Sequence, residues 1–168
     1  LRVAENLKKV LPDIKIVFGG PEVSYDPGEV LRLNQFVDYV ISGEGESTFN
    51  ALLGFLSGRE QEPSGTKGLS FIEDGRITVS NSFPLEKDLD LIPSPYNDEM
   101  LSCVGNRIVY FESSRGCPFS CSYCISSTFE GVRYFSMDRV KADLRFLLTA
   151  GVKLVKFVDR TFNCNRER

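Results

Sequence analysis

Residues 14–22, Ile-Lys-Ile-Val-Phe-Gly-Gly-Pro-Glu, join a short apolar run to two glycines and a proline. The run at 14–18 is apolar and β-branched, which predicts a buried strand that stops at the glycines. Asp26 and Pro27 follow, and these residue types are typical of a helix N-cap and of the first helical position. We therefore predict a strand at residues 14–18 and a helix at residues 27–34.

The same alternation of elements continues on both sides of this stretch. The first twelve residues place their apolar side chains on one helical face: Val3, Leu7, Val10 and Leu11. Residues 36–41 form a second apolar run, Ser-Gly-Glu-Gly-Glu follows at 42–46, and a helical stripe then continues until Gly58. Strands joined through helices imply a parallel sheet with any ligand at the carboxyl ends of the strands, so the predicted fold class is α/β.

The rest of the chain divides into a connecting region and a second α/β region. Residues 68–72 and 76–80 predict a hairpin around Asp74 and Gly75, and residues 83–98 contain three prolines and resemble a linker. Further on, we expect the following order: a strand at 107–111, a cysteine-containing loop, a helix capped by Ser136 and a strand at 153–158. This order is that of the beginning of a partial (β/α) barrel, in which active-site residues follow the strands.

Three cysteines lie within eight residues of that loop, at Cys117, Cys121 and Cys124. Three thiolates can hold an iron–sulfur cluster and leave one iron without a protein ligand, whereas a closed structural zinc site normally uses four ligands. Gly116 and Pro118 flank the first cysteine and give the loop a permissive backbone. The spacing therefore predicts a metal centre with an open coordination position.

The composition narrows the chemistry that the chain can perform. It has 168 residues, 42% of them hydrophobic and 26% charged, with a formal net charge of -3 and no histidine. The absence of histidine excludes Cys/His zinc sites and histidine bases within the chain. Residues 101–168 carry 11 Lys/Arg against 6 Asp/Glu, which suits an anionic cofactor, although a solvated basic face is an equal alternative.

The five cysteines, three of them crowded, do not resemble a disulfide framework. With no apolar run of membrane-spanning length and no secretory leader, we expect a cytoplasmic protein. No basic tract indicates nucleic acid as a partner. The main alternative is a non-catalytic α/β module that holds zinc on the three loop cysteines together with Cys103 or Cys164.

The pattern Cys117-x-x-x-Cys121-x-Tyr-Cys124 after a strand resembles the signature of the radical S-adenosylmethionine superfamily. The resemblance implies a [4Fe-4S] cluster on the three cysteines, with S-adenosylmethionine chelating the free iron, and an external electron donor and a small-molecule substrate as partners. It also implies that Tyr123 lies near the cofactors. Where the superfamily has a Gly-Gly-Glu-like motif for the methionyl amino group, residues 157–163 lack those glycines, and Asp159 is the expected acceptor.

The upstream half is similar to the carboxyl half of the flavodoxin-like, cobalamin-binding domain that precedes many radical S-adenosylmethionine barrels. The resemblance rests on glycines after two strands, Gly19, Gly20, Gly43 and Gly45, and on the connector 89–95. These glycines would let cobalamin approach the backbone, while simple turns are the alternative explanation. The Asp-x-His-x-x-Gly motif of that domain is absent from this chain. Among cobalamin-associated members, Mg-protoporphyrin IX monomethyl ester oxidative cyclases have the most similar layout, and methyltransferases are the other expectation.

We accordingly divide the sequence into three parts: a cobalamin-binding-like domain at 1–60, a hairpin and linker at 61–100, and the start of a radical S-adenosylmethionine barrel at 101–168. We expect the chain to be a fragment of a longer enzyme, inactive by itself and prone to self-association through open sheet edges. A methylthiotransferase relative is a further alternative, although the chain has no second cysteine triad.

Overall fold

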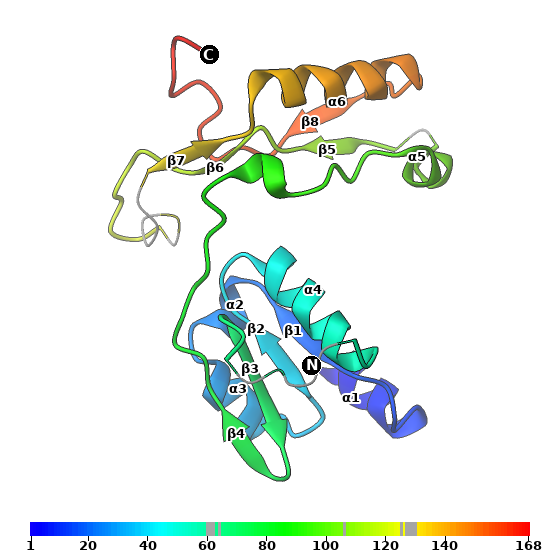
Figure 1. Ribbon diagram of the computed structural model, residues 1–168, viewed down its shortest axis with the longest axis vertical. Coiled ribbons are helices and arrows are strands. Elements are labelled where there is room, and N and C mark those ends of the chain that lie inside the picture. Colours follow the sequence, from blue (N-terminus) through cyan, green and yellow to red (C-terminus); the bar gives the residue numbers. More distant parts are fainter. Residues whose placement is uncertain (60–62, 64, 106, 125, 127–130) are drawn as a thin grey trace. The chain divides into compact units, whose positions relative to one another are not determined.

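The computed structural model describes residues 1–59, 63, 65–105, 107–124, 126 and 131–168. The chain folds as two units, Leu1–Glu86 and Lys87–Arg168 (Figure 1).

Unit 1 is built on a mixed four-stranded sheet in the order β1-β2-β3-β4. The first two strands are parallel, as predicted, and the hairpin β3–β4 adds to the sheet through an antiparallel pairing of β2 with β3. Asp74 and Gly75 form the hairpin turn with φ values of 48° and 75°, the left-handed conformation that two-residue hairpin loops favour. The strands are β1 (Val17–Gly19), β2 (Tyr39–Ile41), β3 (Leu69–Glu73) and β4 (Arg76–Thr78).

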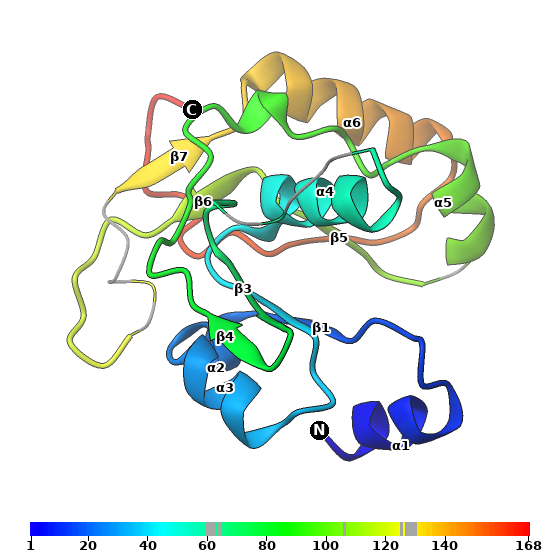
Figure 2. The same ribbon diagram turned by 60° about the horizontal axis from the view of Figure 1, so that its bottom comes forward.

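Helices cover both faces of this sheet. Successive side chains of β2 point to opposite sides, so this strand contributes to an apolar cluster on each face. Tyr39 and Ile41 pack with Leu52 of α4 (Gly45–Leu56) in one apolar cluster. Val40 packs with Leu31 of α3 (Pro27–Leu33) in another. Figure 2 shows the sheet of unit 1 with α3 and α4 beside it. Unit 1 is therefore a three-layer α/β/α arrangement, which confirms the predicted fold class.

The ends of the helices in unit 1 follow the sequence signals. The Asp26 side chain accepts a hydrogen bond from the Glu29 backbone N–H at 2.8 Å and caps α3. The first helix, α1 (Arg2–Val10), is joined to the sheet region through Lys8, whose Nζ lies 2.9 Å from the Asp38 carboxylate. The short α2 (Pro21–Ser24) was not predicted, because a single turn has too little periodicity to recognise.

Unit 2 pairs two parallel strands, β5 (Val109–Phe111) and β8 (Val155–Phe157), which are connected through α6 (Met137–Thr149). Ser136 caps α6 as predicted, since its Oγ accepts a hydrogen bond from the Arg139 N–H at 3.2 Å. The buried core residues come from β5, from α6 and the connection before it, and from the segment before α5: Leu89, Val109, Phe111, Phe135, Val140 and Leu147. The remaining elements, which were not predicted, are η1 (Leu89–Leu91), α5 (Asp98–Val104), β6 (Ser114–Gly116) and β7 (Val132–Tyr134).

The two structural units differ from our three-part division of the sequence. The hairpin belongs to unit 1 because β3 pairs with β2, and the proline-containing residues after Glu86 belong to unit 2 because Leu89 enters its core. The barrel stays a prediction, since one parallel strand pair with its helix is common to barrels and open sheets. Among the described residues, no helix is long and apolar enough to cross a lipid bilayer.

Gly68 allows the start of β3 to approach the end of β2. Its φ is +79°, and a Cβ there would lie 2.6 Å from the Ser42 carbonyl oxygen and 2.8 Å from Pro84 Cδ. We predict that Gly68→Ala lowers the free energy of unfolding by about 2–5 kcal/mol, the sum of the left-handed backbone penalty and of overpacking. Urea-induced unfolding measures the loss.

Gly58 is the matched control for this substitution. It has a φ of +75° but nothing lies within 4 Å of a Cβ added there, so Gly58→Ala should lose only about 1–2 kcal/mol. Equal losses at Gly58 and Gly68 would contradict the close approach of β2, β3 and Pro84.

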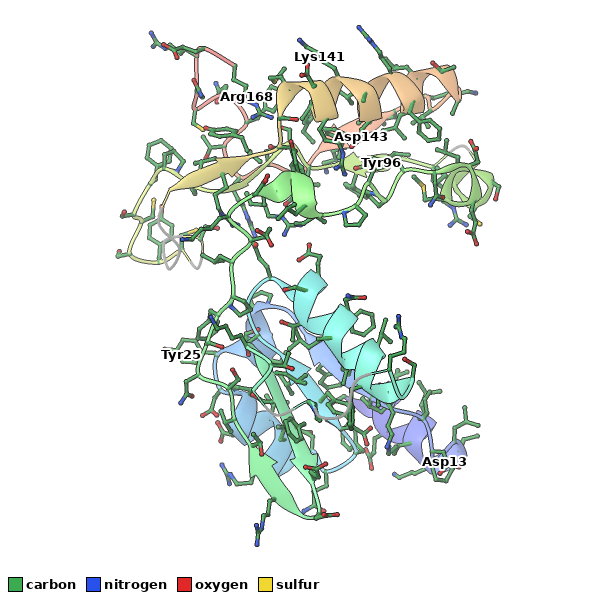
Figure 3. The ribbon with its side chains drawn as sticks, in the orientation of Figure 1. Asp13, Tyr25, Tyr96, Lys141, Asp143 and Arg168 are labelled. Carbon is green, nitrogen blue, oxygen red and sulfur yellow. The ribbon has the colours of Figure 1, made fainter. Side chains whose placement is uncertain are left out.

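Tyr96 makes the stability of unit 2 sensitive to alkaline pH. Its hydroxyl donates to the Tyr110 carbonyl at 2.9 Å and its ring stacks on Phe111. Burial, with the charges of Asp143 and Glu112, raises the pKa of Tyr96 to about 12. Figure 3 labels the side chains of Tyr96 and Asp143. An unfolded tyrosine ionises near pH 10, so the free energy of unfolding should fall as pH rises from about 10 to about 12.

The substitution Tyr96→Phe keeps the stacked ring and removes the ionisable group. Chemical unfolding across this pH range should show a smaller decrease in stability for Tyr96→Phe than for the unsubstituted chain. The same pH dependence in both proteins would assign the alkaline loss of stability to other groups.

Candidate functional site

Unit 1 has an open pocket that runs along β1 and reaches the carboxyl ends of β1 and β2, where a parallel sheet is expected to bind a ligand. The pocket has a volume of about 700 Å³. It is lined by residues of β1, β2 and α4 and by Lys15: Lys15, Val17, Phe18, Gly19, Ile41, Gly45, Glu46 and Phe49. Two of the four glycines predicted from the sequence, Gly19 and Gly45, therefore lie in its wall.

The other two glycines have different surroundings. Gly20 adopts a φ of 98° and precedes α2, and nothing lies within 4 Å of a Cβ added there. Gly43 adopts a φ of 82°, and a Cβ would lie 2.9 Å from the Pro84 carbonyl oxygen. The same carbonyl accepts a hydrogen bond from the Glu44 N–H at 3.1 Å. The close approach of Pro84 thus explains why residue 43 is a glycine.

The pocket is mainly apolar, with charged groups among its lining residues. Phe49 is 43% exposed although it belongs to the apolar stripe of α4, so its ring is available to a ligand. Lys15 has an exposed side chain, and its Nζ lies 4.0 Å from Asp38 Oδ1, which makes a weak ion pair. Lys15, Glu46 and Phe49 were not selected from the sequence. Phe49 was the residue that the sequence could have indicated as part of the pocket. It shares the helical spacing of the apolar residues of α4, however, and that spacing predicted a core position.

The cysteine loop of unit 2 begins directly after β6, which pairs with β7 in an antiparallel ribbon. Gly116, the last residue of β6, has a φ of 98°, and a Cβ there would collide with the Gly131 carbonyl oxygen. Cys117 and Cys124 are half-buried and Cys121 is exposed. A turn connects the last two, because the Cys124 N–H donates to the Cys121 carbonyl at 3.0 Å.

The cysteine loop supplies suitable donors for an iron–sulfur cluster, since three thiols share one short segment and none of the five cysteines is in a disulfide. Among the described residues, the side chains of the triad are not gathered into a metal-binding group. Within the same described residues, Cys103, which is exposed on α5, and Cys164 also belong to no such group. Tyr123 is 91% exposed, so its ring contributes to the surface of the loop.

Asp159 joins the carboxyl ends of the two parallel strands of unit 2. Its Oδ1 accepts hydrogen bonds from Ser113 Oγ at 2.7 Å and from Ser114 Oγ at 2.5 Å. Both carboxylate oxygens also lie within 3.2 Å of the Ser113 backbone N–H. The predicted acceptor for S-adenosylmethionine is therefore already engaged by the segment that leads into the cysteine loop.

The residues after Asp159 also contact the loop and its ribbon. Thr161 Oγ1 lies 3.4 Å from Cys117 Sγ, and Cys164 Sγ lies 3.0 Å from the Tyr134 hydroxyl. The hydrogen bond with Cys164 raises the pKa of Tyr134. Arg168 lies over the Tyr134 ring and donates to the Ser113 carbonyl at 3.1 Å. Ser113, Ser114 and Thr161 were missed in the sequence, because isolated hydroxyl residues in a polar stretch give no distinguishing pattern.

Comparisons with known proteins support the interpretation of both regions. Residues 1–53 match the family described as the B12 binding domain. The chain is 35% identical over 173 residues to an uncharacterised methyltransferase, PH0819, of Pyrococcus horikoshii, a match that covers 99% of this chain and 38% of that protein. It is 27% identical to the cobalamin-dependent radical SAM methyltransferase TokK of Streptomyces tokunonensis, over 96% of this chain and 25% of TokK.

Two further matches concern a cyclase and a solved structure. The anaerobic magnesium-protoporphyrin IX monomethyl ester cyclase of Synechocystis is 30% identical over 70% of this chain and 24% of its own length. The structure of the cobalamin-dependent S-adenosylmethionine radical enzyme OxsB with aqua-cobalamin and S-adenosylmethionine bound aligns with a TM-score of 0.74 at 20% identity. That alignment covers 96% of this chain and 24% of OxsB, and it supports the fold.

The chain spans between about a quarter and two fifths of the length of these proteins. In this chain the B12-binding match covers β1, β2 and most of α4, and the three cysteines of the loop follow downstream. The chain is therefore similar to radical S-adenosylmethionine proteins, and its residues 1–53 match the B12 binding domain.

Proposed function

We propose that the chain supplies the cobalamin-binding region and the cluster-binding loop of a radical S-adenosylmethionine methyltransferase. The observation that supports this most strongly is the cysteine loop that follows β5 and β6 in a parallel strand–helix–strand unit, with Asp159 joining the two strand ends. Carboxyl ends of parallel strands are where α/β enzymes place their reacting groups.

In this proposal, Cys117, Cys121 and Cys124 hold a [4Fe-4S] cluster. When bound, the cluster supplies the electron that cleaves S-adenosylmethionine. Thiolates are the protein ligands that such clusters use, and an exposed loop allows the thiols to converge on the metal. Tyr123 shields one side of the cofactors, and Asp159 orients the loop and accepts a hydrogen bond from the methionyl amino group.

Cobalamin is proposed to bind at the pocket of unit 1. Gly19 and Gly45 expose backbone there, and the apolar side chains of Val17, Ile41 and Phe49 suit a large planar ring system. Gly20 and Gly43 shape the turns that follow β1 and β2, as their positive φ values require. No histidine exists in the chain to ligate cobalt.

Methyl transfer is favoured over cyclisation because of the extent of the alignments. Two proteins with methyltransferase names align with 99% and 96% of this chain, whereas the Synechocystis cyclase aligns with 70%. The proposal includes a small-molecule substrate, an external electron donor and a cytoplasmic location, where thiols stay reduced. Self-association through the open edge of the β5–β8 pair is part of the same proposal.

The cysteine triad can be tested by metal analysis. After anaerobic reconstitution with iron and sulfide, the unsubstituted chain should bind about four iron atoms, as expected of a [4Fe-4S] cluster. Single substitutions Cys117→Ser, Cys121→Ser and Cys124→Ser should each remove most of the iron and the visible absorption of the cluster. Iron and sulfide content, together with the absorption spectrum, provide the measurement.

Cys103→Ser is the matched control, because Cys103 is exposed on α5 and outside the loop. It should leave iron and sulfide content unchanged. Stoichiometric zinc in place of iron, with a requirement for Cys103 or Cys164, would instead support the zinc-binding module and contradict the proposal.

The pocket of unit 1 can be tested with hydroxocobalamin. A Cβ at Gly19 would lie 3.7 Å from the Ile41 carbonyl oxygen, an ordinary contact, so larger side chains should be accommodated while they fill the pocket. We predict that Gly19→Ala weakens cobalamin binding and that Gly19→Val weakens it by at least about tenfold. Spectroscopic titration with hydroxocobalamin measures the dissociation constants.

Gly28→Ala provides the control for a glycine substitution in unit 1 outside the pocket lining. Its added Cβ would meet only the Val79 and Asp26 side chains, at 3.1 Å and 3.6 Å. The affinity of Gly28→Ala for hydroxocobalamin should match that of the unsubstituted chain. Unchanged binding in Gly19→Val, in a variant that remains folded by circular dichroism, would exclude this pocket as the cobalamin site.

A further inference from the structure

We propose that Thr161 is a positioning residue for the cluster: its hydroxyl donates a hydrogen bond to the Sγ of Cys117 and thereby raises the reduction potential of the bound [4Fe-4S] cluster. This inference rests on the proposed function, because it requires Cys117 to be a cluster ligand. It concerns a residue outside the cysteine motif, from the segment that follows β8.

The contact itself is an oxygen–sulfur distance of 3.4 Å between Thr161 Oγ1 and Cys117 Sγ. In the free thiol, either atom can be the donor. Once Cys117 coordinates iron it is a thiolate and has no proton to donate. The hydroxyl of Thr161 then becomes the donor, and the charge on sulfur strengthens the hydrogen bond.

Neighbouring contacts hold Thr161 in this place. Two residues earlier, the Asp159 carboxylate binds Ser113 and Ser114, which lie just before Cys117 on the chain. One residue later, the Phe162 ring lies 4.7 Å from the Phe157 ring, centroid to centroid. The Thr161 carbonyl also accepts a weak hydrogen bond from the Cys164 N–H at 3.4 Å. The segment that contains Thr161 is therefore fixed at both ends.

The electrostatic consequence concerns the reduced state. Reduction adds one negative charge to the cluster and its sulfur ligands, so a hydrogen bond to sulfur stabilises the reduced form more than the oxidised form. Hydrogen bonds to the sulfurs are among the factors that set the potential of such clusters. Cys117 is half-buried, so water does not freely replace the hydroxyl of Thr161.

The test is a redox titration of the reconstituted chain, followed by the electron paramagnetic resonance signal of the reduced cluster. Thr161→Val replaces the hydroxyl by a methyl group of similar size. We expect reduction to become about tenfold less favourable, which corresponds to a midpoint potential about 59 mV lower for a one-electron couple. Thr161→Ser keeps the hydroxyl and should stay close to the unsubstituted chain.

Thr149→Val is the matched control, since Thr149 is the exposed last residue of α6. It should leave the potential unchanged. If Thr161→Val does not retain its cluster, Thr161→Ala, which has no added methyl group to accommodate, gives the measurement and should show the same lower potential.

The possible failures are distinguishable. An unsubstituted chain that takes up no iron overturns the proposed function and this inference with it. A cluster that forms with full iron content but has the same potential in Thr161→Val overturns the inference alone. An equal decrease in Thr161→Ser and Thr161→Val also overturns it, because the hydroxyl would then not be responsible.

Discussion

The hydrogen bonds between Asp159 and the two serines after β5 are the interaction on which the second unit depends. Backbone hydrogen bonds join β5 and β8 up to the bond from the Val158 N–H to the Phe111 carbonyl at 2.9 Å, and beyond that point side-chain hydrogen bonds continue the connection. The Asp159 carboxylate accepts from both serine hydroxyls and from one backbone N–H. Hydrogen bonds to a charged group contribute about 1.5–3 kcal/mol each. Together they join the strand ends at the point where the chain enters the cysteine loop.

In the first unit, close backbone packing and a carboxylate together support the end of β2 and the start of β3. Pro84 lies against Gly43, at the end of β2, and against Gly68, at the start of β3. The Pro84 carbonyl accepts from Glu44, and the Glu44 carboxylate accepts from the Glu86 N–H at 2.8 Å. The two glycines at strand ends of this unit therefore have different surroundings. Gly43 packs against the segment that contains Pro84, whereas Gly19 lies in the pocket wall.

Local sequence patterns predicted several elements: apolar runs predicted β1 and β2, capping residues predicted the start of α3 and of α6, and turn residues predicted the hairpin. The parallel strands β1 and β2, the capped helices α3 and α6 and the hairpin at Asp74 are all confirmed. Asp26 and Ser136 could be identified as helix N-caps because each side chain accepts a hydrogen bond from the backbone N–H three residues later in the sequence. These features depend on neighbours in the sequence, which is why the pattern reveals them.

The features that escaped prediction depend on residues far apart in the chain. The pairing of β2 with β3 joins segments about thirty residues apart, and the three-residue strands β6 and β7 contain polar residues without alternation. The contact of Asp159 with Ser113 spans 46 residues. Nothing in a single sequence marks which of many serines will lie near an aspartate, so the candidate cysteines were predictable and their supporting residues were not.

The three cysteines differ in how firmly the fold holds them, and this has a consequence for cluster assembly. Cys117 follows Gly116, whose backbone is fixed against Gly131, and it lies beside Thr161. Cys121 is exposed on the loop. Ordering a flexible backbone costs about 1–2 kcal/mol per residue, and metal–thiolate bonds must supply that free energy. A cluster on these cysteines would therefore need its largest ordering at Cys121, the exposed member of the triad, while the fold sets the position of Cys117.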